Sequence, residues 1–177
     1  FTPEQRSAAL KRATEMRAAR AEYLGRVKSG EVSIADALEA AAEAIACPPA
    51  EKKPGAFNVI GACYDAFRVG SDTAEICRLM KAAFGMEPAC ILPYACGYDD
   101  VRRCTEAEIS LVLRQEGLRA AAVIEKKGGG APVYGAPYGY EGTKAWIDRV
   151  AEALGRAPDP AFQSALDQKL VWARGKE

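Results

Sequence analysis

Side chains capable of chemistry gather directly after short apolar runs of this sequence. Thiolates can hold an iron–sulfur cluster, and a glycine-rich turn at the start of a helix can hold an anion. The chain has no histidine, which excludes Ser-His-Asp and Cys-His nucleophiles and histidine metal ligands within it. The candidate residues that follow the four apolar runs are Cys63, Tyr64, Asp65, Tyr94, Cys96, Arg114, Gly135, Pro137, Tyr138, Gly139 and Thr143.

The six cysteines show neither a C-x-x-C pair nor a zinc-ligand spacing. Without a secretion signal, we expect free thiols in a reducing cytoplasm. Cys90 lies inside a predicted strand and Cys104 near a predicted helix, so of these only Cys96 belongs to a loop. Cys63 stands near a strand end, and a Cys63–Cys96 pair across adjacent loops is the metal-binding candidate. The alternative is that all six are ordinary buried or loop cysteines.

The turn at residues 135–140, Gly-Ala-Pro-Tyr-Gly-Tyr, combines glycines with a predicted helix start. Its spacing is not G-x-G-x-x-G, it follows the fourth strand rather than the first, and no Walker lysine accompanies it. Nucleotide binding nevertheless stays one interpretation, because a glycine-rich turn at a helix start presents free N–H groups to an anion. The other is that Gly135 and Gly139 adopt backbone angles that other residues resist.

Residues 56–154 alternate between strand and helix patterns. The predicted strands are short and apolar without polar alternation, which is typical of strands covered on both faces: Ala56–Gly61, Ala89–Leu92, Ile109–Leu113 and Pro132–Tyr134. The predicted helices between and after them are Asp72–Phe84, Asp100–Glu108, Leu118–Lys127 and Glu141–Leu154. Such alternation with short connections predicts right-handed crossovers. We expect a Rossmann-like α/β fold with a parallel sheet of about four strands and flanking helices.

A helical N-terminal segment is expected before this domain. Thr2 and Pro3 begin a helix over 3–24, and Ser33 caps a second one over Ile34–Ala46. We predict a basic helical segment at 1–46, a linker at 47–55, the Rossmann-like domain at 56–157 and a C-terminal helix within 158–177. The first residue is Phe1 rather than Met, so we expect a fragment, a processed product or an incomplete reading frame.

Charge is balanced overall, with 24 basic and 24 acidic residues. Residues 1–30 carry seven Lys/Arg against three Glu, a net charge of +4. Arg12, Arg17 and Arg20 on the first helix could contact phosphates, which makes DNA the alternative partner. No apolar run is long enough to span a bilayer, so we expect no membrane partner and a cytoplasmic protein.

Two segments resemble the middle domain of the nitrogenase component 1-type oxidoreductases over about residues 54–157. One is Phe57-Asn58-Val59-Ile60-Gly61 with the helix start Gly70-Ser71-Asp72-Thr73-Ala74-Glu75-Ile76. The other is the strand and turn at 131–143, whose Gly, Pro and closing Thr143 form the most specific motif. The resemblance implies that these loops help to line the cavity that holds a cofactor or substrate in that family. The family's cofactor cysteine, where present, follows the third strand, and here Leu113-Arg114-Gln115 stands there instead. Arg114 and Glu116 are expected to form a surface ion pair or to contact a polar substrate.

The resemblance implies a part of a reductase subunit that passes electrons to a bound substrate or metallocofactor. It implies an iron–sulfur cluster in the complete assembly, a second component 1-type subunit and an ATP-dependent iron–sulfur reductase as partners. The family's cluster cysteines belong mainly to another domain, so we expect no cofactor in the isolated chain and no catalysis by it alone.

The first 38 residues or so resemble the start of the actinobacterial integration host factor, a small nucleoid protein. The matching segments are Thr2–Leu10 and Val27–Ser33. The helices that should follow in that protein are absent. This resemblance implies the alternative function, DNA binding, and a third alternative is a small-molecule-binding α/β module.

Overall fold

The computed structural model describes residues 2–174 apart from several short gaps. These gaps are 3–5, 8–9, 12–13, 15–17, 19–20, 23–24, 27, 50 and 64–67. Much of the predicted helix 3–24 therefore lies outside the described residues. So do five predicted site residues, namely Tyr64, Asp65, Arg12, Arg17 and Arg20.

Four parallel strands form one sheet, which confirms the predicted fold class. They are β1 (Ala56–Ala62), β2 (Glu87–Pro93), β3 (Ile109–Val112) and β4 (Ala131–Tyr134), in the order β2-β1-β3-β4. Phe57 is paired with Ile109, and Ile109 with Ala131, which fixes the register across the sheet. All of β1 and β3 is buried, because central strands of a parallel sheet are covered on both faces.

Helices follow the strands much as predicted. The α-helices are α2 (Ile34–Ile45), α3 (Val69–Phe84), α4 (Tyr98–Arg102), α5 (Leu118–Lys126), α6 (Gly139–Leu154) and α7 (Pro160–Arg174). Two short 3-10 turns, η1 (Cys104–Glu106) and η2 (Gln115–Gly117), precede β3 and α5. Ser33 caps α2 in a reciprocal capping box with Asp36. Gly85 and Gly155 end α3 and α6 in the left-handed conformation.

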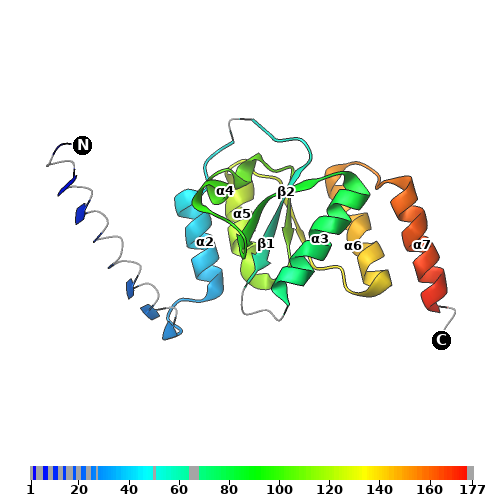
Figure 1. Cartoon of the computed structure of the whole chain (residues 1–177), viewed down its shortest axis with the longest axis horizontal. Helices are drawn as coiled ribbons and strands as arrows, with labels where there is room; N and C mark the ends of the chain where they lie inside the picture. The colour runs from blue at the N-terminus through cyan, green and yellow to red at the C-terminus, as the bar shows by residue number, and fades with distance from the viewer. Residues whose placement is uncertain are drawn as a thin grey trace.

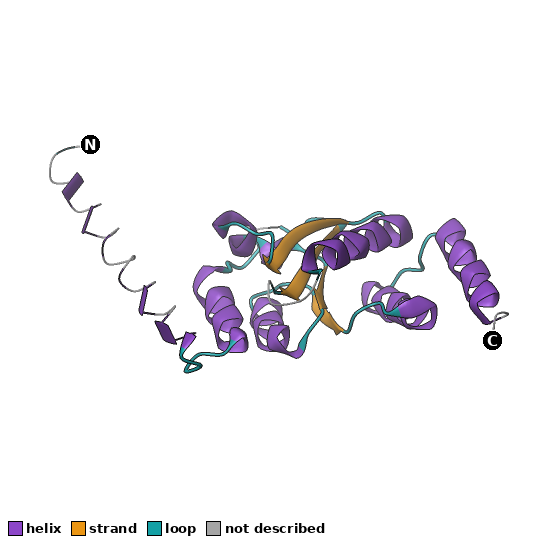
Figure 2. Ribbon diagram, turned by 60° about the horizontal axis from the view of Figure 1, so that its bottom comes forward, coloured by secondary structure: helices purple, strands orange, loops and turns teal. Residues whose placement is uncertain are grey.

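The sheet lies between two helical layers, as Figures 1 and 2 show. On one face α3 and α6 pack with Ile76, Met80, Trp146, Ile147 and Val150 in a buried cluster. On the other face α2, α4 and α5 pack in a second cluster. Its members include Leu38, Ala42, Val101, Ala120, Ala121 and Ile124. Helix α7 lies outside the first layer and contacts α6 and α3.

The predicted helix Asp100–Glu108 is wrong in its length. Helix α4 ends at Arg102, and the chain turns into η1. The side-chain amide of the buried Asn58 donates to the carbonyl of Cys104 at 2.8 Å. Thr105 donates to the carbonyl of Cys47. The first contact ties this segment to β1, and the second ties it to the residues after α2.

The buried face of α6 contains Trp146. This side chain is fully buried, whereas the neighbouring Ala145 is exposed. Val150 lies four residues after Trp146 and three after Ile147, so these three side chains share one face of the helix. Burying the large indole removes more apolar surface from water than burying a methyl group would.

Polar contacts join α2 to the sheet domain. Arg119 on α5 contacts Asp36 at 2.6 Å and is also paired with Glu39. The ammonium of Lys127 donates to the carbonyls of Ala42 and Ala46 at 3.0 and 2.9 Å. The last turn of α2 thus receives a cation at its negative end. The predicted boundary between a segment 1–46 and a domain 56–157 stays a prediction.

Within the described part of the chain, no helix has the length and apolar character needed to cross a bilayer.

Candidate functional site at the carboxyl edge of the sheet

Strand order places a switch point between β1 and β3. The chain leaves β1 for α3 on one face, and it leaves β3 for α5 on the other face. Because the two connections diverge, they leave a crevice at the carboxyl ends of these adjacent strands. Open α/β sheets bind ligands at such a crevice.

A pocket of about 160 Å³ lies at this edge. It is walled by the end of β1, the first turns of α3, the segment after β3 and the turn after β4. The lining residues are Gly61, Ala62, Val69, Asp72, Thr73, Glu75, Ile76, Leu113, Arg114, Ala136, Pro137 and Tyr138. Three of them, Arg114, Pro137 and Tyr138, are among the site residues predicted from the sequence.

Close backbone approach forms the floor of the pocket. Gly61 has φ +87°, and a Cβ there would stand 3.4 Å from the backbone nitrogen of Arg114. Only glycine takes this conformation without strain. The amide of Leu113 donates to the carbonyl of Ile60 at 2.9 Å. These contacts bring the segment after β3 directly over the end of β1.

Charged groups stand at the rim. Arg114 forms an ion pair with Glu116 at 2.9 Å, and both side chains are about one-third exposed. This confirms the expected ion pair. Glu75 accepts two hydrogen bonds from Arg78, which lower the pKa of its carboxyl. The lining therefore carries two ion-paired charges, the guanidinium of Arg114 and the carboxylate of Glu75.

Three hydrogen bonds fix the turn after β4 and the start of α6. The amide of Gly135 donates to the carbonyl of Val112 at 2.9 Å. The carbonyl of Gly135 accepts from the indole of Trp146 at 3.0 Å. Thr143 donates to the carbonyl of Gly139 at 2.6 Å, one helical turn earlier. Gly135 and Gly139 have φ of +114° and +62°, which confirms their expected conformational role.

The remaining predicted residues do not line this pocket. Cys63 is buried in the cluster on the α2 and α5 side. Cys96 packs against the same cluster and is half-buried. Tyr94 is half-buried, and its hydroxyl lies against Gly70, where a Cβ would approach it to 2.7 Å. Gly139 and Thr143 lie in the first turns of α6. Roles for these residues in binding stay predictions.

Sequence reasoning missed the contribution of α3. Val69, Asp72, Thr73 and Ile76 all face the pocket from its first two turns. The sequence contains a relevant signal, because the first strand–helix connection of such sheets regularly borders the ligand. None of these four residues is among the site residues predicted from the sequence.

The described residues do not fit a metal cluster. Among them, no group of three or more cysteine, aspartate or glutamate side chains is arranged to hold a metal ion. We therefore assign no step to a metal centre held by this part of the chain.

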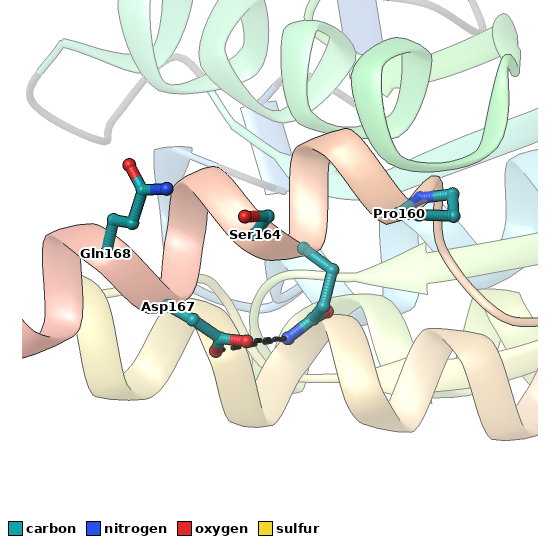
Figure 3. Close-up of a pocket in the computed structure, with 5 residues that line it drawn as sticks. Pro160, Ser164, Asp167 and Gln168 are labelled. Atoms are coloured by element: carbon teal, nitrogen blue, oxygen red, sulfur yellow. Dashed lines mark hydrogen bonds between the residues drawn. The ribbon is translucent and has the colours of Figure 1, made fainter.

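A second hollow lies along α7. Its lining residues, Pro160, Gln163, Ser164, Asp167 and Gln168, all come from that one helix. Figure 3 shows their side chains along the helix, with a hydrogen bond joining Gln163 to Asp167 at 3.2 Å. Asp167 also contacts Lys144 of α6 at 3.5 Å. No lining residue comes from an opposing element, so the hollow is a surface depression and we place no site there.

Comparison with known proteins gives the family. The profile of the nitrogenase component 1 type oxidoreductases matches residues 11–174. The chain is a member of this family, as the resemblance in the middle of its sequence implied.

Curated relatives agree with this membership. The chain is 32% identical over 99 residues to one subunit of the light-independent protochlorophyllide reductase of Chloroherpeton thalassium, covering 55% of this chain and 18% of that protein. It is 31% identical over 133 residues to the corresponding subunit from a Methylobacterium species, covering 73% and 26%. The chain thus spans about a fifth to a quarter of the length of these relatives.

Solved structures support the fold. The structure of nitrogenase Cp1 at pH 6.5 matches with a TM-score of 0.59 and 20% identity, over 76% of this chain and 25% of that chain. At pH 5 the TM-score is 0.58 and the identity 18%, over 76% and 27%. None of these relatives supports DNA binding. The resemblance of the first 38 residues to an integration host factor stays a prediction.

Proposed function

We propose that this chain contributes part of the wall of a ligand cavity in a nitrogenase component 1-type oxidoreductase, where electrons reach a bound substrate. The observation that carries this proposal is the pocket at the switch point. It combines an apolar interior with a charged rim, and it stands where such sheets bind ligands. The family membership supplies the reaction class.

The size of the pocket supports a role as one wall. A complete site for a drug-sized molecule occupies roughly 300 to 1,000 Å³, whereas this pocket measures about 160 Å³. It accepts one edge of a larger ligand. The rest of that ligand would contact other parts of the assembly.

The lining indicates the kind of edge that fits. Ala62, Val69, Ile76 and Leu113 present apolar surface inside, and Tyr138 offers an exposed ring at the entrance. Arg114, already oriented by Glu116, can donate to a polar substituent from the rim. A planar conjugated ring with polar substituents has this chemistry. Protochlorophyllide, which the names of the curated relatives specify, belongs to the class.

The chain's own residues would then bind and orient the substrate and exclude water from one face of it. We propose that the cluster that delivers electrons is held elsewhere in the assembly, since the described residues offer no suitable ligand group. A second component 1-type subunit and an ATP-dependent iron–sulfur reductase are the partners that this function requires.

Protochlorophyllide binding to the purified chain tests the proposal. Titration followed by the fluorescence of the ligand should saturate. Ala136→Trp fills the pocket from its half-buried turn, and it should weaken binding at least about tenfold, or 1.4 kcal/mol. Ala122→Trp places the same side chain on the exposed surface of α5 and should leave binding unchanged. Absence of saturation, or equal weakening by both variants, would contradict the proposal.

A further inference from the structure

Two cysteines face each other across the turn that follows β2. Ile91 and Ala95 form an isolated antiparallel bridge, and the amide of Ala95 donates to the carbonyl of Ile91 at 3.0 Å. If this antiparallel register is continued by one step, the next two residues outward stand opposite each other. Those residues are Cys90 and Cys96. The pairing arises from the fold, because their spacing matches no redox motif in the sequence.

This register suits a disulfide. Opposite residues of an antiparallel pair have Cα atoms about 4.5 to 5.5 Å apart. A disulfide joins Cα atoms about 4.4 to 6.8 Å apart. Cys90 belongs to a buried cluster, and the half-buried Cys96 packs against the same cluster. Both cysteines are free thiols in this structure.

The two thiols differ in environment. Cys90 is 3% exposed, whereas Cys96 is half-buried in the loop. The hydrogen bond from the Cys90 thiol to Cys96 lowers the pKa of Cys96. The same hydrogen bond, followed by burial, raises the pKa of Cys90. Cys96 is thus the accessible sulfur that more readily forms a thiolate, the reactive species in exchange.

We infer that Cys90 and Cys96 form a thiol–disulfide exchange site for low-molecular-weight disulfides such as glutathione disulfide. The Cys96 thiolate attacks one sulfur of the small disulfide, forms a mixed disulfide and releases one glutathione thiolate. The Cys90 thiol then passes its proton through solvent to the released glutathione thiolate and attacks the Sγ of Cys96. This breaks the mixed disulfide and releases the second glutathione as a thiolate, which solvent protonates. Two protein thiols are oxidised to one disulfide, and one glutathione disulfide is reduced to two thiols. This inference is independent of the proposed function.

Cys104 is the competing thiol in this neighbourhood. It belongs to the same buried cluster, and burial raises the pKa of its thiol to about 11. Asp100 is the nearby carboxylate, and its charge opposes thiolate formation at Cys96. Cys104 comes from η1 rather than from the bridged turn, so it lacks the register that places Cys90 opposite Cys96. We therefore assign the exchange to the Cys90–Cys96 pair.

Peptide mapping distinguishes the possible products. Cleavage after Lys81, Arg102 and Arg103 places Cys90 and Cys96 together in peptide 82–102 and Cys104 in a separate peptide. After incubation of the native chain with glutathione disulfide and blocking of free thiols, peptide 82–102 should be lighter than its reduced form by two hydrogen atoms. Reduction with dithiothreitol should restore it. A cross-link to the Cys104 peptide, or recovery of both thiols unreacted, would overturn the inference.

Variants identify the order of the two steps. Cys90→Ala should stop at a stable mixed disulfide, so that peptide 82–102 gains one glutathione. Cys96→Ser should leave Cys90 unmodified, because the remaining thiol is buried. Cys77→Ser on α3 is the matched control, and its peptide 82–102 should be oxidised like that of the unaltered chain. A mixed disulfide on Cys90 in the Cys96→Ser variant would contradict the assigned roles, and the mapping of the unaltered chain decides the pairing even if a variant fails to fold.

Discussion

The indole Nε1 of Trp146 donates a hydrogen bond to the carbonyl oxygen of Gly135 across 3.0 Å. Trp146 is fully buried against the sheet, whereas Gly135 begins the turn that supplies Ala136 and Pro137 to the pocket. The core of the domain therefore holds a wall of the candidate site in place. Packing of α6 and the shape of the pocket depend on the same side chain.

Removing this hydrogen bond should destabilise the domain. Trp146→Phe keeps an aromatic ring but leaves the carbonyl of Gly135 without its indole donor. A lost buried partner of this kind costs about 1 to 3 kcal/mol. Tyr140→Phe, on an exposed residue of the same helix, should change the free energy of unfolding by less than about 0.5 kcal/mol. Urea unfolding of both variants measures the difference, and equal effects would contradict the role of the indole.

Two glycines should respond to alanine with opposite signs. A Cβ at Gly130 would stand 2.1 Å from the backbone oxygen of Glu108, so Gly130→Ala should destabilise the fold by at least about 1 to 3 kcal/mol. A Cβ at Gly142 would meet its nearest neighbour only at 4.0 Å. Gly142→Ala should stabilise α6 by about 0.5 to 1 kcal/mol. Thermal unfolding followed by circular dichroism compares the pair, and a stable Gly130→Ala variant would disprove the packing of β3 against β4.

Lys127 should anchor the end of α2. Its ammonium contacts three carbonyls there, those of Ala42, Glu43 and Ala46. Lys127→Met removes these charge-assisted hydrogen bonds. A hydrogen bond to a charged group contributes about 1.5 to 3 kcal/mol to stability. Hydrogen exchange of the α2 amides should accelerate, while Lys126→Met on the exposed neighbour should leave the exchange unchanged. Unaltered protection in the Lys127→Met variant would show that α2 is held by its apolar face alone.

Ionisation of Asp36 should make the stability of the fold depend on pH. Hydrogen bonds from the backbone and hydroxyl of Ser33, and then from Arg119, lower the pKa of this carboxyl to about 2. The pKa of an aspartate in an unfolded chain is about 3.9. A lowered folded pKa means that the stabilisation is full above the unfolded value and is lost as pH falls toward about 2. The urea midpoints of the unaltered chain and Asp36→Asn should differ at pH 6 and converge between about pH 4 and 2. A constant difference would contradict this assignment.

The sheet and its helices were predictable because their signals are local. Short apolar runs, the Ser33 cap and the glycines at 85 and 155 each specify a neighbouring element. The length of α4 was not predictable, since Asn58 and Cys47, far away in the sequence, bind the segment that should have continued the helix. Trp146 was missed for the same kind of reason. Its hydrogen-bond partner becomes apparent only when the turn after β4 is placed beside α6.

The candidate site was only partly predictable. Arg114, Pro137 and Tyr138 follow strand ends, and the rule about carboxyl ends of parallel strands finds them. The rule does not predict toward which face of the sheet each of these side chains points. Cys63 turns toward the α2 and α5 layer, whereas Ala62, one residue earlier, lines the pocket. The glycine at 61, with its positive φ, shifts the register at this point, and local sequence does not reveal such a shift.

Amide chemical shifts during titration with protochlorophyllide would test the central claim most directly. In nitrogen-15-labelled protein, the account predicts saturable changes at Ala62, Leu113, Arg114 and Ala136. Amides on the far faces of α5 and α7 should stay unchanged. Saturable changes confined to α7, or scattered over the surface with no concentration at the carboxyl edge, would contradict the assignment of the ligand site.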